Sequence, residues 1–574
     1  MPNKELARIF DQIADLLEIK GEDPFRINSY RRVARTIGDL NEDVADIAAA
    51  GRLTDIPRVG KGTAERIQQY LQTGKVESHQ QLLNEIPSGL PALLDIPGMG
   101  PKKVAAAWKK LGVTDLDSLV AVIDSGKLAE LPGFGAKSVA QIQQGIEFLQ
   151  RSLARTPLGI ALPVARRLAG QLADLAAVKQ VEIAGSARRG RETIGDVDIL
   201  CQSAAGKKVV DAFTQFEQVK QVLAAGATKA SILVETPGGA DLQVDVRVVP
   251  AKSFGAALQY FTGSKEHNVR LREIAVKKKL KLNEYGLFRG DKQIAGAQEA
   301  DIYAKLGLPF IPPELREDRG EIEAADNLPR LVTLDNIRGD LHLHTIASDG
   351  HQTAEQLGRF AKDYGYEYIA VADHSKSQTI ANGLSIDRMY EQIETVRAAD
   401  RKVRGIAILL ATEIDILAGG KLDYPDDLLA ECDLVIASIH SGMGQDRATV
   451  TKRTLAAMDN PHVHVIGHPT GRLLGKREAM DIDIDQVIRH AVETHTALEV
   501  NASWQRLDLK DVHVRQAIDA GAMLVLNTDA HAPDQFDFMS FGVQTARRGF
   551  ATPDSILNTR PLAPLRKWLA RKRS

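Results

Sequence analysis

The second half of the chain alternates short apolar segments with amphipathic helical patterns, and most of the apolar segments end in a side chain that can bind a metal ion. Six segments end in this way, at 341–344, 368–374, 408–413, 434–440, 463–468 and 523–531. A seventh apolar segment lies at 497–501. Helical patterns separate them at 353–363, 387–400, 448–458, 484–495 and 512–520. This alternation predicts a parallel sheet, and ligands gathered at the strand ends predict a nearly closed barrel with one polar mouth.

Histidine is concentrated in the same part of the chain, because 12 of the 14 histidines follow residue 340. A lone histidine is more often a hydrogen-bonded structural residue than a ligand, but repetition at equivalent strand ends favours metal binding. The predicted ligands are His342, His344, Asp349, His374, Glu413, His440, His468, Asp529 and His531. Nine mixed nitrogen and oxygen donors are too many for one ion and suit three zinc, manganese or iron ions. The histidines expected to be structural are His351, His462, His464, His490, His495 and His513.

A pair of carboxylates lies in Gly195-Asp196-Val197-Asp198, ten residues after Gly185-Ser186-Ala187-Arg188-Arg189-Gly190. On a strand, alternation places Asp196 and Asp198 on one face, where both can hold a divalent ion. Backbone N–H groups and the hydroxyl of the Gly-Ser turn can hold phosphate oxygens beside such ions. Asp245, in a later predicted strand, is expected to supply a third carboxylate. The pattern predicts phosphoryl transfer from a nucleoside triphosphate with two Mg2+ or Mn2+ ions.

Three segments near the N-terminus repeat one pattern, an apolar residue and proline followed by a glycine-containing turn that opens a helix. They are 56–64, 96–104 and 131–139. Backbone N–H groups at a helix N-terminus can bind a DNA phosphate, and three copies favour DNA-backbone binding over a simple turn between packed helices. The predicted contacts are Gly60, Gly62, Gly98, Gly100, Lys102, Gly133, Gly135 and Lys137. The first copy departs from the pattern, because Arg58 replaces its first glycine.

Composition limits the remaining classes of protein. Two cysteines cannot form a disulfide framework, and the sequence has neither an apolar run of transmembrane length nor a signal peptide at its start. We therefore expect a cytoplasmic protein without a membrane partner, and a monomer, because no coiled-coil pattern is present. The net charge is −2, but residues 101–300 carry 29 Lys and Arg against 20 Asp and Glu, a local excess that suits DNA.

Residues 1–315 resemble a family X DNA polymerase of the polymerase beta type. The resemblance is carried by the two motifs around the carboxylates, the third aspartate, Tyr260-Phe261-Thr262-Gly263-Ser264, Asn283-Glu284-Tyr285 and the helix-hairpin-helix repeats, all in the family's order. It implies DNA polymerase activity on gapped or primer–template DNA with dNTP substrates. It also implies a helical N-terminal region, followed by palm and thumb-like parts.

The resemblance assigns roles to individual residues. It implies that Asp196 and Asp198 bind both metals, while Asp245 binds the catalytic metal and takes up the primer 3′-OH proton. Arg272 is the implied contact beside the base pair. The implied nucleotide contacts are Ser186, Arg189, Gly195, Tyr260, Phe261, Gly263, Lys265, Asn268 and Arg155.

Two positions depart from the polymerase beta pattern. Arg66 aligns with the lysine that forms the Schiff base for removal of 5′-deoxyribose phosphate. A guanidinium stays protonated and forms no imine, so we expect weak or absent lyase activity by that route. Lys265 stands where polymerase beta has an acidic residue, and it is expected either to strengthen nucleotide binding or to be a solvated cation.

Residues 337–540 resemble the polymerase and histidinol phosphatase (PHP) domain. The match runs through His-x-His, Ser-Asp-Gly, Asp-His, Glu, Ser-Ile-His, Gly-His-Pro and Thr-Asp-Ala-His, which fill every ligand position of the active pattern. The resemblance implies a distorted (β/α)7 barrel that hydrolyses phosphoesters with three metal ions. Arg472 and Lys476 follow the Gly-His-Pro motif and are expected to hold substrate phosphate.

The sequence therefore predicts a multidomain chain, with a helical helix-hairpin-helix region, an α/β nucleotidyltransferase palm and a PHP barrel. Three prolines between 309 and 313 mark the approach to a linker. The expected parts are a small DNA-binding domain at 1–85, a fingers-like region at 86–152, the palm at 153–250, a thumb-like part at 251–315, a linker at 316–336 and the PHP domain at 337–574.

Together the two halves resemble a bacterial family X polymerase that carries a PHP domain, which implies short-gap filling in base excision repair. The barrel is then expected to act as a 3′→5′ exonuclease and 3′-end phosphoesterase, and on abasic sites as an AP endonuclease. Two alternatives for the barrel are a pyrophosphatase or small-molecule phosphatase, and a non-catalytic module stabilised by metal. A third alternative is a DNA-binding scaffold with a silent palm, against which the three carboxylates argue.

Overall fold

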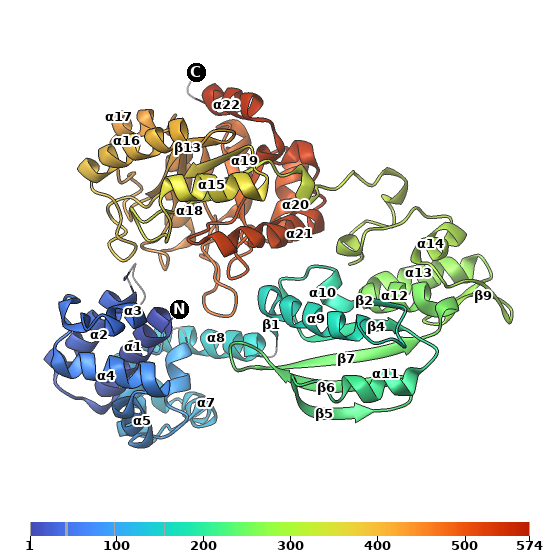
Figure 1. Cartoon of the computed structure of the whole chain (residues 1–574), viewed down its shortest axis with the longest axis horizontal. Coiled ribbons are helices and arrows are strands. Elements are labelled where there is room, and N and C mark those ends of the chain that lie inside the picture. Colours follow the sequence, from blue (N-terminus) through green and yellow to red (C-terminus); the bar gives the residue numbers. More distant parts are fainter. Residues whose placement is uncertain (1, 39, 41–43, 97, 154, 573–574) are drawn as a thin grey trace. The chain divides into compact units, whose positions relative to one another are not determined.

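The computed structural model describes residues 2–38, 40, 44–96, 98–153 and 155–572, and Pro97 of the second repeat lies outside them. The chain forms two compact units (Figure 1). One unit comprises Met1–Leu153 with Gly475–Arg477, and the other comprises Ala154–Leu474 with Glu478–Ser574. No described helix combines the length and the apolar character needed to cross a membrane.

The first unit is helical. Its helices are α1 (Pro2–Lys20), α2 (Pro24–Gly38), α3 (Val44–Ala49), α4 (Lys61–Thr73), α5 (Glu77–Asn84), α6 (Pro101–Leu111), α7 (Leu116–Asp124) and α8 (Ala136–Leu153). Helix α1 is central, because it packs against α2, α3, α4, α5 and α6. Leu6, Phe10 and Ile13 of α1 are fully buried, and their spacing places them on one face of the helix.

The three N-terminal repeats form equivalent turns, each followed directly by a helix, α4, α6 or α8. At the first glycine position of the repeat, φ is +89° in both Gly98 and Gly133. Arg58 adopts φ of +69° at the same position of the first repeat. That conformation favours glycine, so Arg58 carries backbone strain that the other two copies avoid.

In the second unit, the palm is a five-stranded sheet with the strand order β2-β4-β7-β6-β5. Its strands are β2 (Gln180–Ile183), β4 (Asp196–Gln202), β5 (Val219–Ala225), β6 (Lys229–Glu235) and β7 (Asp241–Val249). The accompanying elements are β1 (Thr156–Pro157), α9 (Leu158–Ala173), α10 (Gly185–Arg188), β3 (Thr193–Ile194) and α11 (Gly206–Phe213). The predicted strands that carry the carboxylates, β4 and β7, are confirmed and are parallel neighbours. Strands β5 and β6 have no counterpart in the sequence prediction. Strand β5 exposes nearly all its side chains and shows no apolar alternation, whereas β6 is mostly buried.

The thumb-like part follows the palm sheet. It contains α12 (Phe254–Thr262), α13 (Lys265–Lys277), β8 (Lys281–Asn283), β9 (Gly286–Arg289), β10 (Lys292–Ala295) and α14 (Glu299–Leu306). The segment 316–336, expected as a linker, packs against this part. Arg316 and Glu321 are fully buried, and Ile322 and Leu331 belong to its apolar core.

The barrel is a sheet of seven strands in chain order, with every neighbouring pair parallel. The strands are β11 (Gly339–Leu343), β12 (Tyr368–Val371), β13 (Ala407–Asp415), β14 (Leu434–Ser438), β15 (Val465–Ile466), β16 (Ala497–Asn501) and β17 (Leu524–Asn527). The helices are α15 (Ala354–Tyr364), α16 (Ile386–Lys402), α17 (Asp426–Glu431), α18 (Arg447–Met458), α19 (Ile484–Glu493), α20 (Asp511–Ala520), α21 (Met539–Arg548) and α22 (Leu562–Arg571). Leu343 bridges to Ala530, and the N–H of Leu341 donates to Asn527 Oδ1 at 3.1 Å, so the first and last strands meet. The predicted, nearly closed barrel is confirmed.

Helix α22 closes the barrel at the N-terminal ends of its strands. Leu565, Trp568 and Leu569 of this helix lie in one core cluster with Tyr368 and Leu434, the first residues of β12 and β14. The helix therefore forms an apolar floor, and the strand ends that carry the predicted ligands lie at the opposite end of the barrel.

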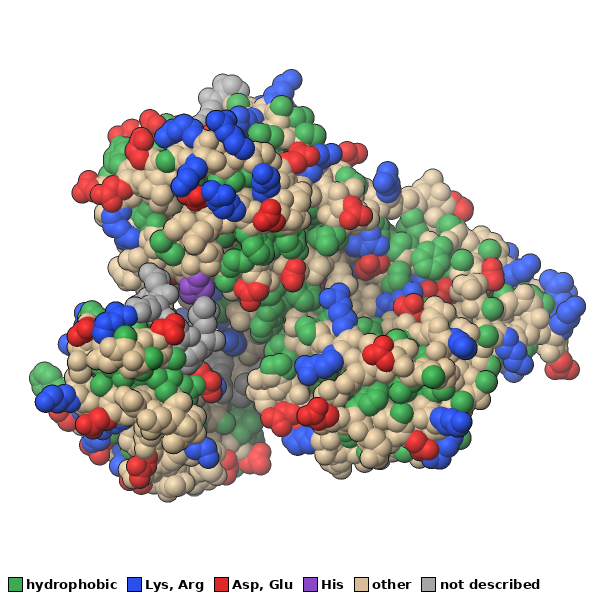
Figure 2. Space-filling view, viewed as in Figure 1, with side chains coloured by type: hydrophobic (Ala, Val, Ile, Leu, Met, Phe, Trp, Pro, Cys, Tyr) green, Lys and Arg blue, Asp and Glu red, His purple; other side chains and the backbone are tan. Residues whose placement is uncertain are grey.

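The surface carries mixed charge, in line with the net charge of −2. On the face drawn in Figure 2, Lys and Arg side chains are interspersed with Asp and Glu, and little histidine is visible. His342, His344 and His468 are buried, so these predicted ligands belong to the interior of the barrel.

The packing of α22 predicts that Leu565→Ala destabilises the barrel by about 3 kcal/mol, because deletion of a buried leucine removes apolar contacts and leaves a cavity. Lys567→Ala, on the exposed face of the same helix, is expected to stay within about 0.5 kcal/mol of the wild type. Urea unfolding of the full chain, followed by tryptophan fluorescence, measures both. Equal unfolding midpoints for the two variants would contradict the role of α22 as a floor.

Candidate active sites

The acidic site lies on two neighbouring parallel strands of the palm. Asp196 and Asp198 come from β4, and Asp245 comes from β7, in register with Asp198. Asp196 is exposed, Asp198 is half-buried and Asp245 is buried. Gln243 Nε2 donates to Asp245 Oδ1 at 3.0 Å, and Lys229 Nζ lies 3.9 Å from Asp245 Oδ2. The fold thus brings the three predicted carboxylates together.

The protonation of Asp198 reflects this crowding of carboxylates. Burial raises the pKa of Asp198, and the charges of Asp196 and Asp245 raise it further, to about 7. Arg247 and Lys229 act against this rise without cancelling it. Divalent cations fit such a face, because their charge would stabilise the ionised carboxylates.

Gly185 explains why the Gly-Ser turn lies beside the aspartate pair. Its φ of +64° lies in the left-handed region. A Cβ at this position would lie 2.7 Å from Asp198 Oδ2. Only glycine both adopts this backbone conformation readily and leaves room for the Asp198 carboxylate. Glycine at position 185 therefore lets the predicted phosphate-binding turn lie directly beside the predicted metal-binding strand.

Both arginines of the Gly-Ser motif are paired with carboxylates. Arg188 makes two hydrogen bonds to Glu299, at 2.9 and 2.8 Å. The Nε of Arg189 donates to Glu317 Oε1 at 2.9 Å, and its Nη1 donates to the carbonyl oxygen of Thr262 at 2.7 Å. The predicted triphosphate contact of Arg189 therefore has to use its third nitrogen or exchange one of these bonds.

Two further predicted nucleotide contacts, Arg155 and Gly195, lie side by side. Arg155 Nε donates to Thr193 Oγ1 at 3.0 Å. A Cβ on Gly195 would lie 3.3 Å from Arg155 Nη1. Ser186, the remaining predicted contact of the Gly-Ser turn, is half-buried.

Three other predicted nucleotide contacts meet at the end of α12. Asn268 is buried, and its Nδ2 donates to the carbonyl oxygens of Tyr260 at 2.7 Å and Gly263 at 3.2 Å. A Cβ on Gly263 would lie 2.7 Å from Asn268 Oδ1. The Asn268 amide thus maintains the turn after α12, and Tyr260 remains half-buried beside it.

The aromatic and basic residues around this turn differ in exposure. The Phe261 ring is covered by the Arg247 guanidinium, 4.3 Å from the ring centroid. Lys265 is exposed at the start of α13, and Arg272 is half-buried farther along the same helix. An exposed Lys265 is compatible with both roles expected for it.

The three turns of the first unit place buried apolar residues beneath exposed glycines. Val59, Met99 and Phe134 are 5%, 1% and 0% exposed. The predicted DNA contacts are all exposed, namely Gly60, Gly62, Gly98, Gly100, Lys102, Gly133, Gly135 and Lys137. A helix N-terminus held at the surface by a buried anchor suits contact with a phosphate backbone.

The nine predicted ligands of the barrel converge near the C-terminal ends of its strands. Among the described residues, three overlapping groups have ligand atoms within 4.8 Å of one another. The groups are His344, Asp349, His374 and His531; His342, His344 and Asp529; and His374, Glu413 and His440. The ninth ligand, His468, joins them through a hydrogen bond of 2.9 Å between its Nε2 and Glu413 Oε1. Shared members make the nine side chains one cluster.

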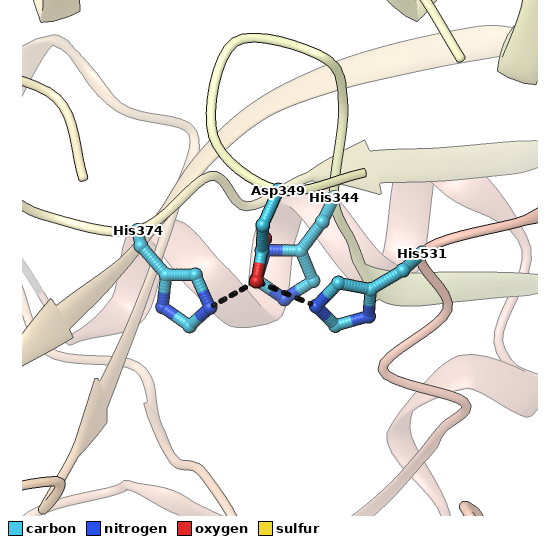
Figure 3. A group of neighbouring side chains, drawn as sticks. All are labelled: His344, Asp349, His374 and His531. Atoms are coloured by element: carbon cyan, nitrogen blue, oxygen red, sulfur yellow. Dashed lines mark ion pairs between the residues drawn. The ribbon is translucent and has the colours of Figure 1, made fainter. Parts of the chain in front are cut away.

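Asp349 lies among three imidazole rings (Figure 3). Its Oδ2 is 3.3 Å from His531 Nε2 and 3.7 Å from His374 Nε2. The His344 ring stacks on those of His531 and His374, with ring centroids 4.3 and 4.4 Å apart. A carboxylate surrounded by imidazoles is a mixed donor set that suits zinc, manganese or iron.

Glu413 is the central carboxylate of the cluster. It is 1% exposed, and its oxygens lie 2.9 Å from His374 Nδ1 and 3.3 Å from His440 Nε2. Burial alone would lower the pKa of His440, but Glu413 and Asp415 outweigh it and raise this pKa to about 9. Because metal ions bind the neutral imidazole, binding here would release protons.

Several nitrogen and oxygen atoms that could bind a metal ion are buried in the cluster without a hydrogen bond. In the part of the chain that the structure describes, they include His342 Nε2, His344 Nδ1, His468 Nδ1 and Glu413 Oε2. Buried polar atoms normally have a partner, so this concentration of unsatisfied donors in one cluster fits metal ligation.

Two carboxylates outside the predicted ligand set hold ligand histidines in place. Glu499 Oε1 lies 2.8 Å from His342 Nδ1, and Asp415 Oδ1 lies 2.5 Å from His440 Nδ1. Such partners fix the tautomer and the orientation of a ligand histidine. Glu499 had a sequence signal, because a single acidic residue within the apolar strand 497–501 requires a buried partner.

Two further residues of the barrel, one expected to be structural and one expected to bind phosphate, have partners outside the ligand cluster. The N–H of Val435 donates to His464 Nδ1 at 3.2 Å, which fits a structural role for that histidine. Arg472, expected to hold substrate phosphate, lies 2.8 Å from Glu192 and donates to the carbonyl oxygen of Leu507. Its guanidinium is thus engaged with the palm and the loop after β16.

Models of known protein families match four parts of the chain. They are a helix-hairpin-helix domain at 1–76, a SAM-like helix-hairpin-helix tandem at 90–147, the DNA polymerase beta thumb at 257–317 and the PHP domain at 340–503. These matches confirm the resemblances found in both halves of the sequence.

Individual relatives show how far the likeness extends. The DNA polymerase/3′–5′ exonuclease PolX of Bacillus subtilis (strain 168) is 38% identical over 573 residues, which cover 100% of each chain. A probable phosphatase of Shewanella sediminis (strain HAW-EB3) is 29% identical over 236 residues, 39% of this chain and 91% of its own. A crystal structure of Leishmania infantum polymerase beta in a ternary complex matches 40% of this chain and 97% of its own, with 24% identity and a TM-score of 0.28. Since the identity to PolX extends over the whole of both chains, the chain belongs to the family of this DNA polymerase/3′–5′ exonuclease.

Proposed function

We propose that the chain is a DNA polymerase that fills short gaps in base excision repair, and that its barrel is a 3′→5′ exonuclease. The observation that carries the proposal is the 38% identity, over the whole of both chains, to a relative named for both activities. The two clusters of charged side chains support it, because one lies on the palm sheet and the other at the strand ends of the barrel.

In the palm, Asp196, Asp198 and Asp245 would hold two Mg2+ or Mn2+ ions. Such ions, when bound, neutralise the charge that develops on the transferred phosphoryl group. Asp245 would also take up the proton of the primer 3′-OH, while Ser186 and Arg189 would bind the triphosphate. The other proposed contacts to the nucleotide and the base pair are Arg155, Gly195, Tyr260, Phe261, Gly263, Lys265, Asn268 and Arg272.

In the barrel, the nine clustered ligands would hold three zinc, manganese or iron ions. Such ions, when bound, activate water and polarise a phosphoester. Glu499 and Asp415 would keep His342 and His440 oriented throughout the reaction. The same donor set suits the 3′-end phosphoesterase and AP endonuclease activities, which we include in the proposal.

The proposed DNA substrate is gapped or primer–template DNA, and its phosphate backbone would bind the helix-hairpin-helix turns. We further propose a cytoplasmic monomer. The proposed parts are 1–85 and 86–152 for DNA binding, 153–250 for the palm, 251–315 for the thumb-like part, 316–336 for the connection and 337–574 for the PHP domain.

A second function for the barrel is that of a phosphatase. It is favoured by the 29% identity of this region to a protein named as a probable phosphatase. Faster release of phosphate from histidinol phosphate or pyrophosphate than degradation of a DNA 3′ end would support this alternative.

Separate inactivation of the two sites tests the proposal. Asp196→Ala/Asp198→Ala is expected to abolish primer extension and leave 3′-end degradation intact, because it removes carboxylates from the palm alone. His342→Ala/His344→Ala is expected to do the reverse. Both reactions are measured on one labelled, gapped primer–template with full-length protein. Loss of both activities in either variant would refute two independent sites.

Metal removal tests whether ions stabilise the barrel as well as supporting its chemistry. A chelator is expected to stop both reactions and to lower the thermal stability of the wild type, because ions that bind only the folded cluster stabilise it. The His342→Ala/His344→Ala variant is the control, and chelation should lower its melting temperature less. If the metal-loaded wild type loses stability on chelation but has no nuclease activity, the barrel is a structural module.

The environment of Arg66 bears on lyase activity. Arg66 Nη1 donates to the carbonyl oxygen of Gly62 at 2.7 Å, and the guanidinium lies 5.8 Å from the Tyr30 ring centroid. We expect borohydride to trap little or no adduct with 5′-deoxyribose-phosphate DNA, because a guanidinium forms no imine. Polymerase beta serves as the positive control, and trapping with equal efficiency would contradict this expectation.

A further inference from the structure

Helix α21 of the barrel packs against the palm next to the Gly-Ser motif. Phe541 of this helix and Leu507 belong to the apolar core cluster of the palm. A Cβ on Gly190, the last residue of the motif, would lie 3.1 Å from Gln544 Cβ. This packing places Arg548, the last residue of α21, next to the Gly-Ser motif.

Arg548 holds Arg189 in two ways. Its Nη1 donates to the carbonyl oxygen of Arg189 at 2.9 Å, which restrains the backbone directly. The same nitrogen donates to Glu317 Oε1 at 3.0 Å, and that oxygen accepts the hydrogen bond from Arg189 Nε at 2.9 Å. A single carboxylate oxygen therefore joins the two guanidinium groups.

These charged groups are largely withdrawn from water. The side chains of Arg548, Glu317 and Arg189 are 4%, 7% and 10% exposed. Asp511 balances the additional positive charge, because its Oδ2 lies 2.7 Å from Arg548 Nη2. Buried charged hydrogen bonds are weakly screened, so removal of Arg548 would disturb the groups that it joins. Glu317 and Asp511 also face Arg191 and Arg319, at 3.4 and 2.8 Å. Arg548 is therefore one of the groups that hold Arg189, and the one that comes from the barrel.

We propose that Arg548, a residue of the barrel, is a positioning residue for the polymerase, which holds Arg189 in the orientation that binds the triphosphate of the incoming nucleotide. The proposal rests on the triphosphate role proposed above for Arg189. Glu317 and the carbonyl oxygen of Thr262 occupy Nε and Nη1 of Arg189, so that Nη2 is the nitrogen left for a phosphate oxygen. The barrel then supports DNA synthesis as well as carrying its own reaction.

Steady-state extension of a gapped primer–template by full-length Arg548→Met tests the proposal. We expect the KM for dNTP to rise about tenfold while kcat stays within about twofold, because a contact equally strong in the ground and transition states affects KM alone. Arg548→Lys keeps the positive charge but loses the two-pronged guanidinium group, so its KM for dNTP should lie between those of the wild type and Arg548→Met. Degradation of 3′ ends should be unchanged, since Arg548 lies outside the metal cluster.

Arg547→Met is the matched control. Arg547 precedes Arg548 in the same helix, and its Nε donates to Glu314 Oε1 at 2.7 Å, three residues before Glu317. The variant removes a similar ion pair without touching Arg189, so its KM for dNTP should equal that of the wild type. Because KM does not depend on the fraction of active protein, partial unfolding of a variant cannot imitate the expected effect. If Arg548→Met yields no folded protein, Glu317→Gln should show the same rise in KM.

Combined variants separate this inference from the proposed function. We expect Arg189→Met/Arg548→Met to match Arg189→Met alone, because the two residues act in series. An unchanged KM in Arg189→Met would overturn the triphosphate role of Arg189 itself. A raised KM in Arg189→Met with a normal KM in Arg548→Met would overturn the positioning role alone. Additive effects of the two substitutions would also overturn the positioning role. A lowered KM in Arg548→Met or Glu317→Gln would overturn it too, because it would show that the network keeps Arg189 away from the nucleotide.

Discussion

Parallel pairing of strands decides where charge gathers in this molecule. Parallel neighbours bring residues of the same register side by side, which places Asp198 opposite Asp245 across β4 and β7. In the barrel, the same geometry collects ligands from the ends of strands that are far apart in the chain. Carboxylates concentrated in this way repel one another unless a cation compensates their charge. The strand pairing that gathers them therefore also creates the need for cations.

The two clusters meet this constraint differently. The palm face gathers three carboxylates, and burial, together with the charges of Asp196 and Asp245, raises the pKa of Asp198 to about 7. The barrel mixes imidazoles with carboxylates, so that Glu413 lies within 3.3 Å of His374 and His440. The palm site therefore offers carboxylate oxygens, whereas the barrel offers nine mixed nitrogen and oxygen donors with oriented histidines.

The sequence was informative where strands are buried on both faces, and less so where a residue's role depends on tertiary packing. Apolar runs, six of them with terminal ligands, predicted all seven barrel strands and the cluster at the strand ends, because a buried parallel strand leaves an unbroken apolar signal. Strand β5, which exposes nearly all its side chains, leaves no such signal. The charged segment 316–336 suggested a linker, and in the structure its Glu321 is buried with Oε1 2.6 Å from His267 Nδ1. Neither this pairing nor that of Arg548 with Arg189 has a local pattern, because only the folded chain brings the partners together.

The packing of α21 into the palm core has a consequence for the modularity of the chain. Leu507 and Phe541 complete an apolar core that otherwise belongs to the palm, and a Cβ on Gly159 of α9 would lie 2.2 Å from Trp504 Cγ. A fragment cut between the palm and the barrel would expose these apolar surfaces on both pieces, which lowers solubility and stability. The palm and the barrel thus belong to one compact unit, and neither can be exchanged for a foreign domain without rebuilding the surface that the other supplies.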